Sequence, residues 1–117
     1  HRIRQGRMED AATQWRKLEK DSMPDLAHQL RLEVGRKVER QNPGQALGLY
    51  EEILADVDLS DRLRFTAALA SARILVKVGR VDIAVRQLEE LLLQQPEDPR
   101  TPIALNELQL LRQRDEG

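Results

Sequence analysis

Apolar side chains recur every three or four residues along almost the whole chain, and this period constrains the fold more than any other feature of the sequence. The first stripe of this kind consists of Met8, Ala11, Ala12, Trp15 and Leu18. Residues with this spacing share one face of a helix, and that face must be buried against another element. We therefore predict an all-α fold.

Cap and turn residues divide the pattern into six helices. Pro24 and Pro43 suit the first position of a helix, and Ser60 suits an N-cap. Gly79 suits the left-handed conformation that follows many helix ends, and Thr101 is expected to cap the last helix. The expected helices run from residue 6 to a stop at 22–24, from 24 to a stop at 41–44, and over 43–57, 61–78, 80–95 and 102 to a charged tail at 112–117.

The fourth predicted helix is apolar on most of its sides. Large residues such as Leu63, Phe65 and Leu75 alternate with small ones such as Ala68 and Ala72. A helix that is apolar all round is buried on most sides, and small residues let its neighbours approach closely. We expect this helix to lie at the centre of the domain.

Composition excludes several classes of function. The 117 residues suffice for one domain, and 19 basic and 20 acidic residues give a net charge of −1, which creates no long-range attraction for nucleic acid or anionic membranes. The absence of cysteine removes disulfides and thiolate metal sites. No apolar run approaches the roughly 18 residues of a membrane span. We predict no nucleic-acid binding and no membrane insertion.

The chain begins at His1 without an initiator methionine, so we expect it to be a fragment of a longer protein. Segments outside it would then carry any membrane anchor or catalytic chemistry. A cytoplasmic location is favoured, while a periplasmic or membrane-tethered soluble domain stays open because neither cysteine usage nor a signal segment decides the compartment.

Three segments of the chain match one another in register: residues 6–18, 45–53 and 79–91. Their central alanines, Ala11, Ala46 and Ala84, are 35 and 38 residues apart. A self-match near 34 residues in an all-helical chain is typical of a helix-turn-helix solenoid. The predicted architecture is therefore a helix-turn-helix repeat array of about six antiparallel helices.

The last unit resembles the tetratricopeptide repeat family. That family has a small residue in the first helix, a turn glycine, an alanine and, four positions later, an aromatic residue in the second helix, and a closing proline. These positions hold Ala72, Gly79, Ala84, Leu88 and Pro96 here, with leucine where the aromatic residue is usual. The two earlier units match at fewer positions, which are Gly35, Ala46 and Tyr50, and Gly6, Ala11 and Trp15. The resemblance covers residues 1–97 and implies a partial repeat over 1–22, repeats over 24–58 and 60–96, and a capping helix over 100–115.

The resemblance also implies a concave groove lined by the first helix of each unit. The partner-binding residues that this predicts are Leu32, Arg36, Leu69, Arg73, Val76 and Lys77. Leu69 and Val76 are expected to form an apolar floor. Arg36 and Arg73 are expected to pair with carboxylates of a bound peptide. The alternative is that the arginines only solubilise the surface and that Leu69 belongs to the core.

No side-chain pattern indicates an active site. His28 is interpreted as a partly exposed surface histidine, and the glutamate pairs at 51–52 and 89–90 as solvated helix faces. The basic residues of the second helix alternate with glutamates and lack the aromatic neighbours of a nucleic-acid site; they are Arg31, Arg36, Lys37 and Arg40. We predict no enzymatic activity, no cofactor and no metal ion.

The favoured function is a protein–protein interaction module that presents its groove to a peptide or a partner protein. Because the first unit lacks its first helix, the helix that carries Trp15 has an uncovered side, and homodimerisation stays open. The alternative is a structural spacer or self-association domain of a larger, membrane-tethered assembly protein with nothing bound in the groove.

Trp15→Ala or Tyr50→Ala is expected to lower the free energy of unfolding by about 3–5 kcal/mol, because each ring is predicted to fill the gap between adjoining helices. Equilibrium denaturation measures this loss. A loss within about 0.5 kcal/mol, as at surface sites, would remove both residues from the predicted core.

Overall fold

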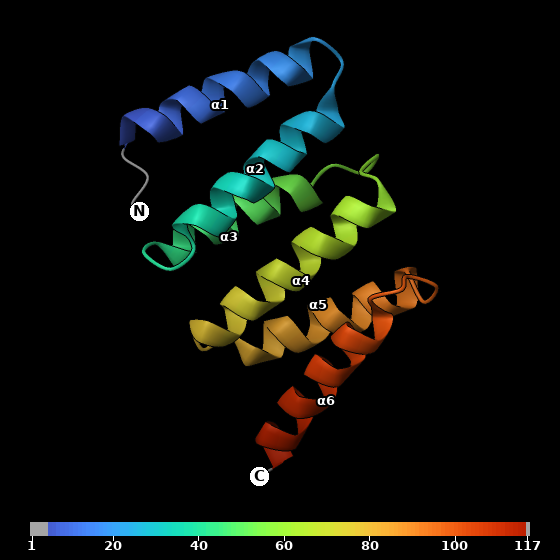
Figure 1. Ribbon diagram of the computed structural model, residues 1–117. Helices are drawn as coiled ribbons and strands as arrows, with labels where there is room; N and C mark the ends of the chain where they lie inside the picture. Colours follow the sequence, from blue (N-terminus) through green and yellow to red (C-terminus); the bar gives the residue numbers. More distant parts are fainter. Residues whose placement is uncertain (1–4, 117) are drawn as a thin grey trace.

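The computed structural model describes residues 5–116, which form six α-helices and no strand. The helices are α1 (Gln5–Lys20), α2 (Pro24–Val38), α3 (Pro43–Leu54), α4 (Asp61–Lys77), α5 (Val81–Gln94) and α6 (Thr101–Glu116). The all-α prediction is confirmed (Figure 1). The third helix ends at Leu54 instead of residue 57, because the Asp56 side chain accepts a hydrogen bond from the Asp58 backbone N–H at 2.9 Å and turns the chain.

Three helix ends follow their local sequence signals. The Ser60 hydroxyl oxygen accepts a hydrogen bond from the Leu63 N–H at 3.4 Å, which caps α4 as predicted. The Asn42 side chain caps α3 in the same way, accepting from the Gln45 N–H at 3.1 Å. Gly79 follows α4 with a φ of 85°, the left-handed conformation that its lack of a side chain permits.

The start of α6 differs from the prediction. Thr101 is the first helical residue, and its hydroxyl donates to the Gln95 carbonyl at 3.2 Å instead of capping the helix. Arg100 anchors this end: its guanidinium donates to the Thr66 hydroxyl at 2.5 Å and lies over the Phe65 ring, 4.5 Å from the ring centre. The beginning of α6 is therefore tied to α4.

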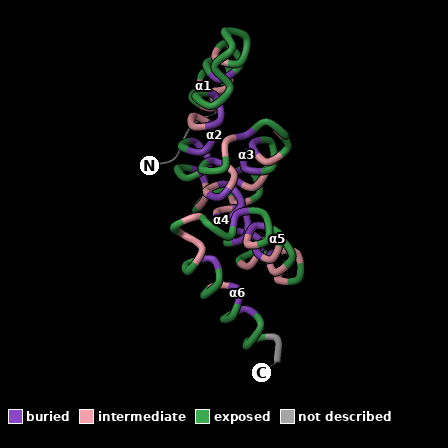
Figure 2. Tube along the Cα trace, turned by 90° about the vertical axis from the view of Figure 1, so that its right-hand side faces the viewer, coloured by how far each residue is buried: buried purple, intermediate pink, exposed green. Residues whose placement is uncertain are grey.

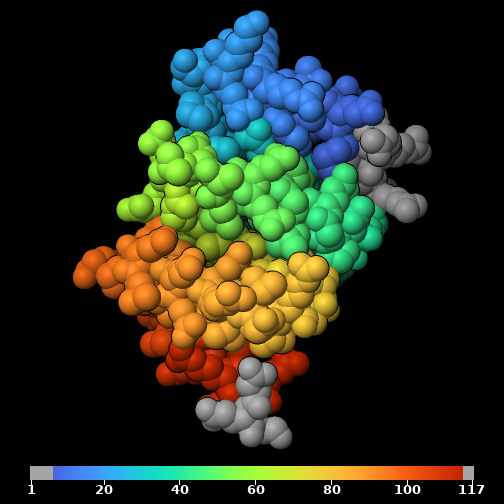
Figure 3. Space-filling model, turned by 180° about the vertical axis from the view of Figure 1, so that it is seen from behind, coloured from blue at the N-terminus to red at the C-terminus, as the bar shows by residue number. Residues whose placement is uncertain are grey.

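The helices succeed one another along the longest dimension of a molecule that measures 45 × 30 × 19 Å. Each helix packs against the next one in the chain, and α2 also packs against α4. The space-filling view shows this order as successive bands of colour from the N-terminal to the C-terminal end (Figure 3). The radius of gyration of 14.9 Å is larger than the roughly 13.4 Å expected for a globular domain of this length, in line with stacking in one direction.

Helix α4 takes part in both hydrophobic clusters of the core. Leu63, Ala67 and Ile74 belong to a cluster with α1, α2 and α3. Phe65 and Leu75 belong to a second cluster with α5 and α6. The prediction that α4 is central is confirmed, whereas the terminal helices α1 and α6 are exposed over most of their length (Figure 2).

In each of the three matching segments, the large residue four positions after the central alanine is buried. Trp15 of α1, Tyr50 of α3 and Leu88 of α5 have 6%, 0% and 1% of their surface exposed. Their predicted place in the core is confirmed.

Tyr50 occupies space that only a glycine on α2 leaves open. A Cβ atom on Gly35 would lie 2.6 Å from Cε1 of the Tyr50 ring. The phenol hydroxyl donates to Glu39 Oε1 at 3.2 Å. Burial, reinforced by the Glu39 carboxylate, raises the pKa of Tyr50 well above its ordinary value of 10.0, so the ring stays neutral at any physiological pH.

Gly35→Ala is expected to lower the free energy of unfolding by about 1–3 kcal/mol, because the new methyl group forces Tyr50 or the backbone of α2 to move. Thermal or denaturant unfolding measures the change. Gly48→Ala is the matched control: a Cβ there meets nothing within 4 Å, so the better helix propensity of alanine should stabilise the chain by about 0.5–1 kcal/mol. Equal effects of the two variants would contradict the close contact at Gly35.

Candidate functional site

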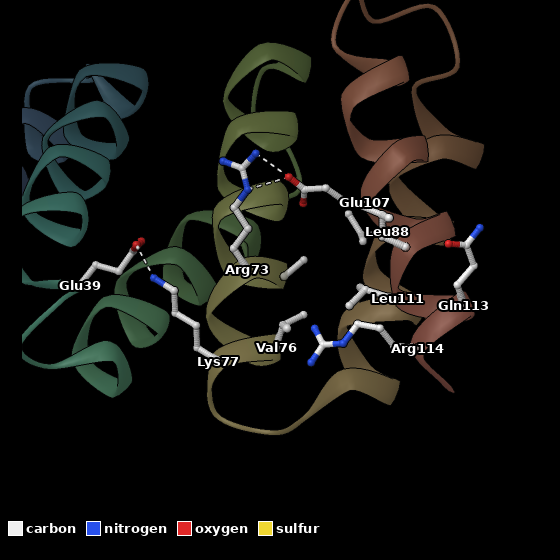
Figure 4. Close-up of a pocket in the computed structure, with 11 residues that line it drawn as sticks. Glu39, Arg73, Val76, Lys77, Leu88, Glu107, Leu111, Gln113 and Arg114 are labelled. Carbon is white, nitrogen blue, oxygen red and sulfur yellow. Dashed lines mark hydrogen bonds and ion pairs between the residues drawn. The ribbon is translucent and has the colours of Figure 1, made fainter. Parts of the chain in front are cut away.

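An open cavity of about 650 Å³ lies between α4 and α6 (Figure 4). Its apolar floor comes from three helices and consists of Ala72 and Val76 on α4, Leu88 on α5, and Leu110 and Leu111 on α6. The volume falls within the range of about 300–1,000 Å³ that is typical of binding pockets. We name this cavity the α4–α6 groove.

Charged side chains form the rim of the groove. Arg73 of α4 donates to Glu107 Oε1 of α6 through Nε at 2.9 Å and through Nη2 at 2.6 Å. Lys77 Nζ lies 3.6 Å from Glu39 Oε2 at the end of α2. Arg114 extends from α6 over the floor towards α4 (Figure 4). Three cations and two carboxylates therefore surround an apolar floor.

The rim ion pairs are too exposed to account for the position of α6. Each is expected to contribute at most about 1 kcal/mol, because water screens both partners. The position of α6 depends instead on its buried leucines and on the Arg100 anchor at its start. The leucines pack in the cluster that α6 shares with α4 and α5, Arg100 ties the start of α6 to α4, and the groove lies farther along between α4 and α6.

The structure brings together three of the six residues predicted to bind a partner. Arg73, Val76 and Lys77 line the groove. Leu32 and Leu69 are each buried in one of the two core clusters. The alternative prediction, that Leu69 belongs to the core, is therefore confirmed. Arg36 is exposed on α2 but is not part of the groove lining.

The contribution of α6 to the groove was not predicted from the sequence. We expected this helix to serve only as a cap, yet it supplies Glu107, Leu110, Leu111 and Arg114. A signal was present in the sequence: Leu110 lies outside the buried stripe of its helix. An apolar residue beyond the buried stripe widens the apolar face of a helix, and a wider apolar face usually indicates that the helix contacts a second element.

A second cavity, of about 540 Å³, lies over a polar network at the other end of the molecule. Arg31 of α2 donates to Glu19 Oε1 of α1 at 2.7 Å, and its Nε lies 3.3 Å from Glu52 Oε2 of α3. Its guanidinium also stacks over the Trp15 ring at 5.2 Å from the ring centre, a cation–π contact of about 1 kcal/mol. Arg31 thus joins three helices.

Two predictions fail in this network. His28, expected on the surface, is only 4% exposed, and Arg31, expected in a solvated basic cluster, is only 7% exposed. Both side chains are buried because polar partners from other helices and from the loop after α3 form hydrogen bonds with them. Polar side chains are buried at acceptable cost when they have such partners. Each contact of the network joins α2 to α1, to α3 or to the loop after α3, or joins two residues within α2. These contacts hold the helices together.

The hydrogen bonds define the tautomer of His28. The guanidinium of Arg31 can only donate, so it donates from Nη1 to His28 Nδ1 at 3.0 Å. The proton on His28 Nε2 then points to Asp56 Oδ2 at 2.9 Å. The hydrogen bond from His28, together with the bond from the Asp58 N–H, holds the pKa of Asp56 below its ordinary value of 3.8.

Within residues 5–116, no three or more histidine, aspartate or glutamate side chains are arranged to hold a metal ion. In the same part of the chain, every helix falls short of the length and apolar character needed to cross a bilayer. Comparison with protein-family models, with curated proteins and with solved structures gave no match to this chain.

Asp56→Asn is expected to lower the free energy of unfolding by about 1 kcal/mol at neutral pH, because a neutral amide replaces the carboxylate that His28 binds. The pKa of Asp56 is lower in the folded chain than in the unfolded chain. The stabilisation that the ionised Asp56 carboxylate provides is therefore complete above pH 3.8, and it is lost as the pH falls through the pKa of Asp56 in the folded chain. Denaturant unfolding of both proteins, from neutral pH to about pH 3, should show the difference shrinking in acid.

The control for this experiment is Asp58→Asn, because only the backbone of Asp58 takes part in the Asp56 hydrogen bond. Its stability should equal that of the wild type at each pH. A difference between Asp56→Asn and the wild type that does not change with pH would contradict the role of the carboxylate.

Proposed function

We propose that the chain is a helical-repeat interaction module that binds a segment of another protein in the α4–α6 groove. The observation that carries the proposal is the open apolar floor bordered by charges from two helices (Figure 4). Apolar surface in contact with water favours any partner that covers it. The charged rim supplies directional contacts that fix the register of a bound segment.

The burial pattern supports the repeat interpretation. Ala46 of α3 and Ala84 of α5 are both fully buried, and the large residues four positions later, Tyr50 and Leu88, are buried as well. Trp15 is buried at the matching position of α1. The matching alanine of α1, Ala11, is only half-buried. Equivalent positions are buried alike when helix pairs stack, because each pair shields the apolar side of the next. The proposed relationship to the tetratricopeptide family depends on this equivalence.

The proposed role is binding without catalysis. The only histidine among the described residues, His28, uses both ring nitrogens within the polar network. The groove itself contains neither histidine nor serine, and its carboxylates are paired with Arg73 and Lys77. This set of groups can hold a peptide through apolar and ionic contacts.

Peptides selected from a random display library on the wild-type protein test the proposal. We expect them to bind at least tenfold more weakly to Leu110→Asp, because the new carboxylate must be desolvated in the apolar floor. Leu110 is 51% exposed, so this change should leave the fold intact, which circular dichroism and thermal unfolding check.

Leu93→Asp is the matched control, since Leu93 is an exposed leucine on α5, 82% exposed, that does not line the groove. It should bind the selected peptides as the wild type does. Peptides that bind all three proteins equally, or a selection that yields none, would contradict the proposal and favour a spacer role.

A further inference from the structure

The turn between α1 and α2 has the same hydrogen bonds as the turn between α4 and α5. In each turn, two backbone N–H groups donate to carbonyls of the last helical turn, at 2.7 and 3.1 Å. A residue of each turn has a positive φ, 62° at Ser22 and 85° at Gly79. This is the Schellman motif, in which the left-handed residue is usually glycine. The first turn therefore holds a serine where the second holds a glycine.

The serine strains the first turn. Its Cβ atom crowds the backbone in the left-handed conformation, whereas glycine adopts this conformation freely. Among residues 5–116, Ser22 is the one non-glycine residue with a positive φ. Asp21, Ser22 and Met23 are all exposed, so opening the turn releases the strain without uncovering a buried side chain of the turn.

Helix α1 is held mainly by α2. Among the described residues, α1 has several close backbone contacts with α2 alone. The Arg31 guanidinium of α2 lies over the Trp15 ring and donates to Glu19 Oε1. None of these contacts involves the turn that joins the two helices. Helix α1 of another copy, placed on the same α2, would make the same contacts.

From these features we propose that two copies of the chain exchange α1, so that α1 of each copy packs against α2 of the other. The exchange keeps the α1–α2 contacts and frees Ser22 of both copies from its left-handed conformation. A short hinge under strain favours such an exchange, and mass action favours the dimer at high protein concentration. The α4–α6 groove is not involved, so this proposal and the proposed function are tested separately.

Sedimentation velocity of the wild type tests the exchange. The protein is incubated at millimolar concentration just below the midpoint of thermal unfolding, and it is then cooled and diluted. We expect a dimer that dissociates slowly after dilution, because α1 must detach in both copies before they separate. Ser22→Gly is expected to raise the dissociation constant of the dimer about tenfold, since glycine removes the strain from the monomer.

Asp21→Gly is the matched control, because Asp21 is the adjacent exposed residue of the turn and its φ is not positive. This variant gives the turn a glycine without removing the strain at Ser22, so it should dimerise as the wild type does. Equal weakening of the dimer in both variants would show that the flexibility of the turn decides the equilibrium, which would overturn the role of Ser22.

A variant that lacks residues 21–22 tests where α1 lies in the dimer. Met23 alone then joins the two helices, and antiparallel helix pairs need loops of about two to five residues, so α1 cannot fold back on its own α2. We expect this variant to be a dimer at every concentration measured. The fluorescence of Trp15, the single tryptophan of the chain, should show the same burial as in the wild type.

Three outcomes would overturn the proposal. The first is a wild type that stays monomeric throughout the incubation. The second is a wild-type dimer that Ser22→Gly leaves unchanged, because the copies would then meet at another surface. The third is a monomeric variant without residues 21–22 in which Trp15 is exposed to water.

Discussion

The burial of α4 on two opposite sides is the constraint on which the rest of the structure depends. One side of α4 meets a cluster that extends to α1, and the other meets a cluster that extends to α6. Two apolar sides on one helix require small residues at the crossings, and Ala67 and Ala72 at these places are almost completely buried.

The sequence was sufficient to predict features that depend on neighbouring residues. The helix period, the Ser60 cap, the glycine after α4 and the central role of α4 all follow from short-range patterns, and the structure confirms each of them. Burial of His28 and Arg31 was missed for the opposite reason. Their partners Glu19, Glu52 and Asp56 come from other elements, and nothing in the local sequence of α2 shows that these would converge.

The groove shows the same division between local and long-range information. Arg73, Val76 and Lys77 could be assigned to a groove on the resemblance to the tetratricopeptide family, but the position of α6 could not be predicted. That position depends on Arg100 binding to Thr66, more than thirty residues earlier in the chain. A loop residue outside the groove therefore helps to position one of its walls, and loops are often the segments that shape a binding site on a rigid scaffold.

The way in which the two apolar clusters meet on α4 also affects how the molecule opens. Among the described residues, α1 has several close backbone contacts only with α2. The amide hydrogens of α1 therefore exchange with solvent once the α1–α2 interface alone has separated. The amide hydrogens of α4 become accessible only when both clusters have come apart. Local unfolding of α1 can therefore precede the unfolding of α4. The backbone hydrogen bonds of α4, in the middle of the chain, are the last to break.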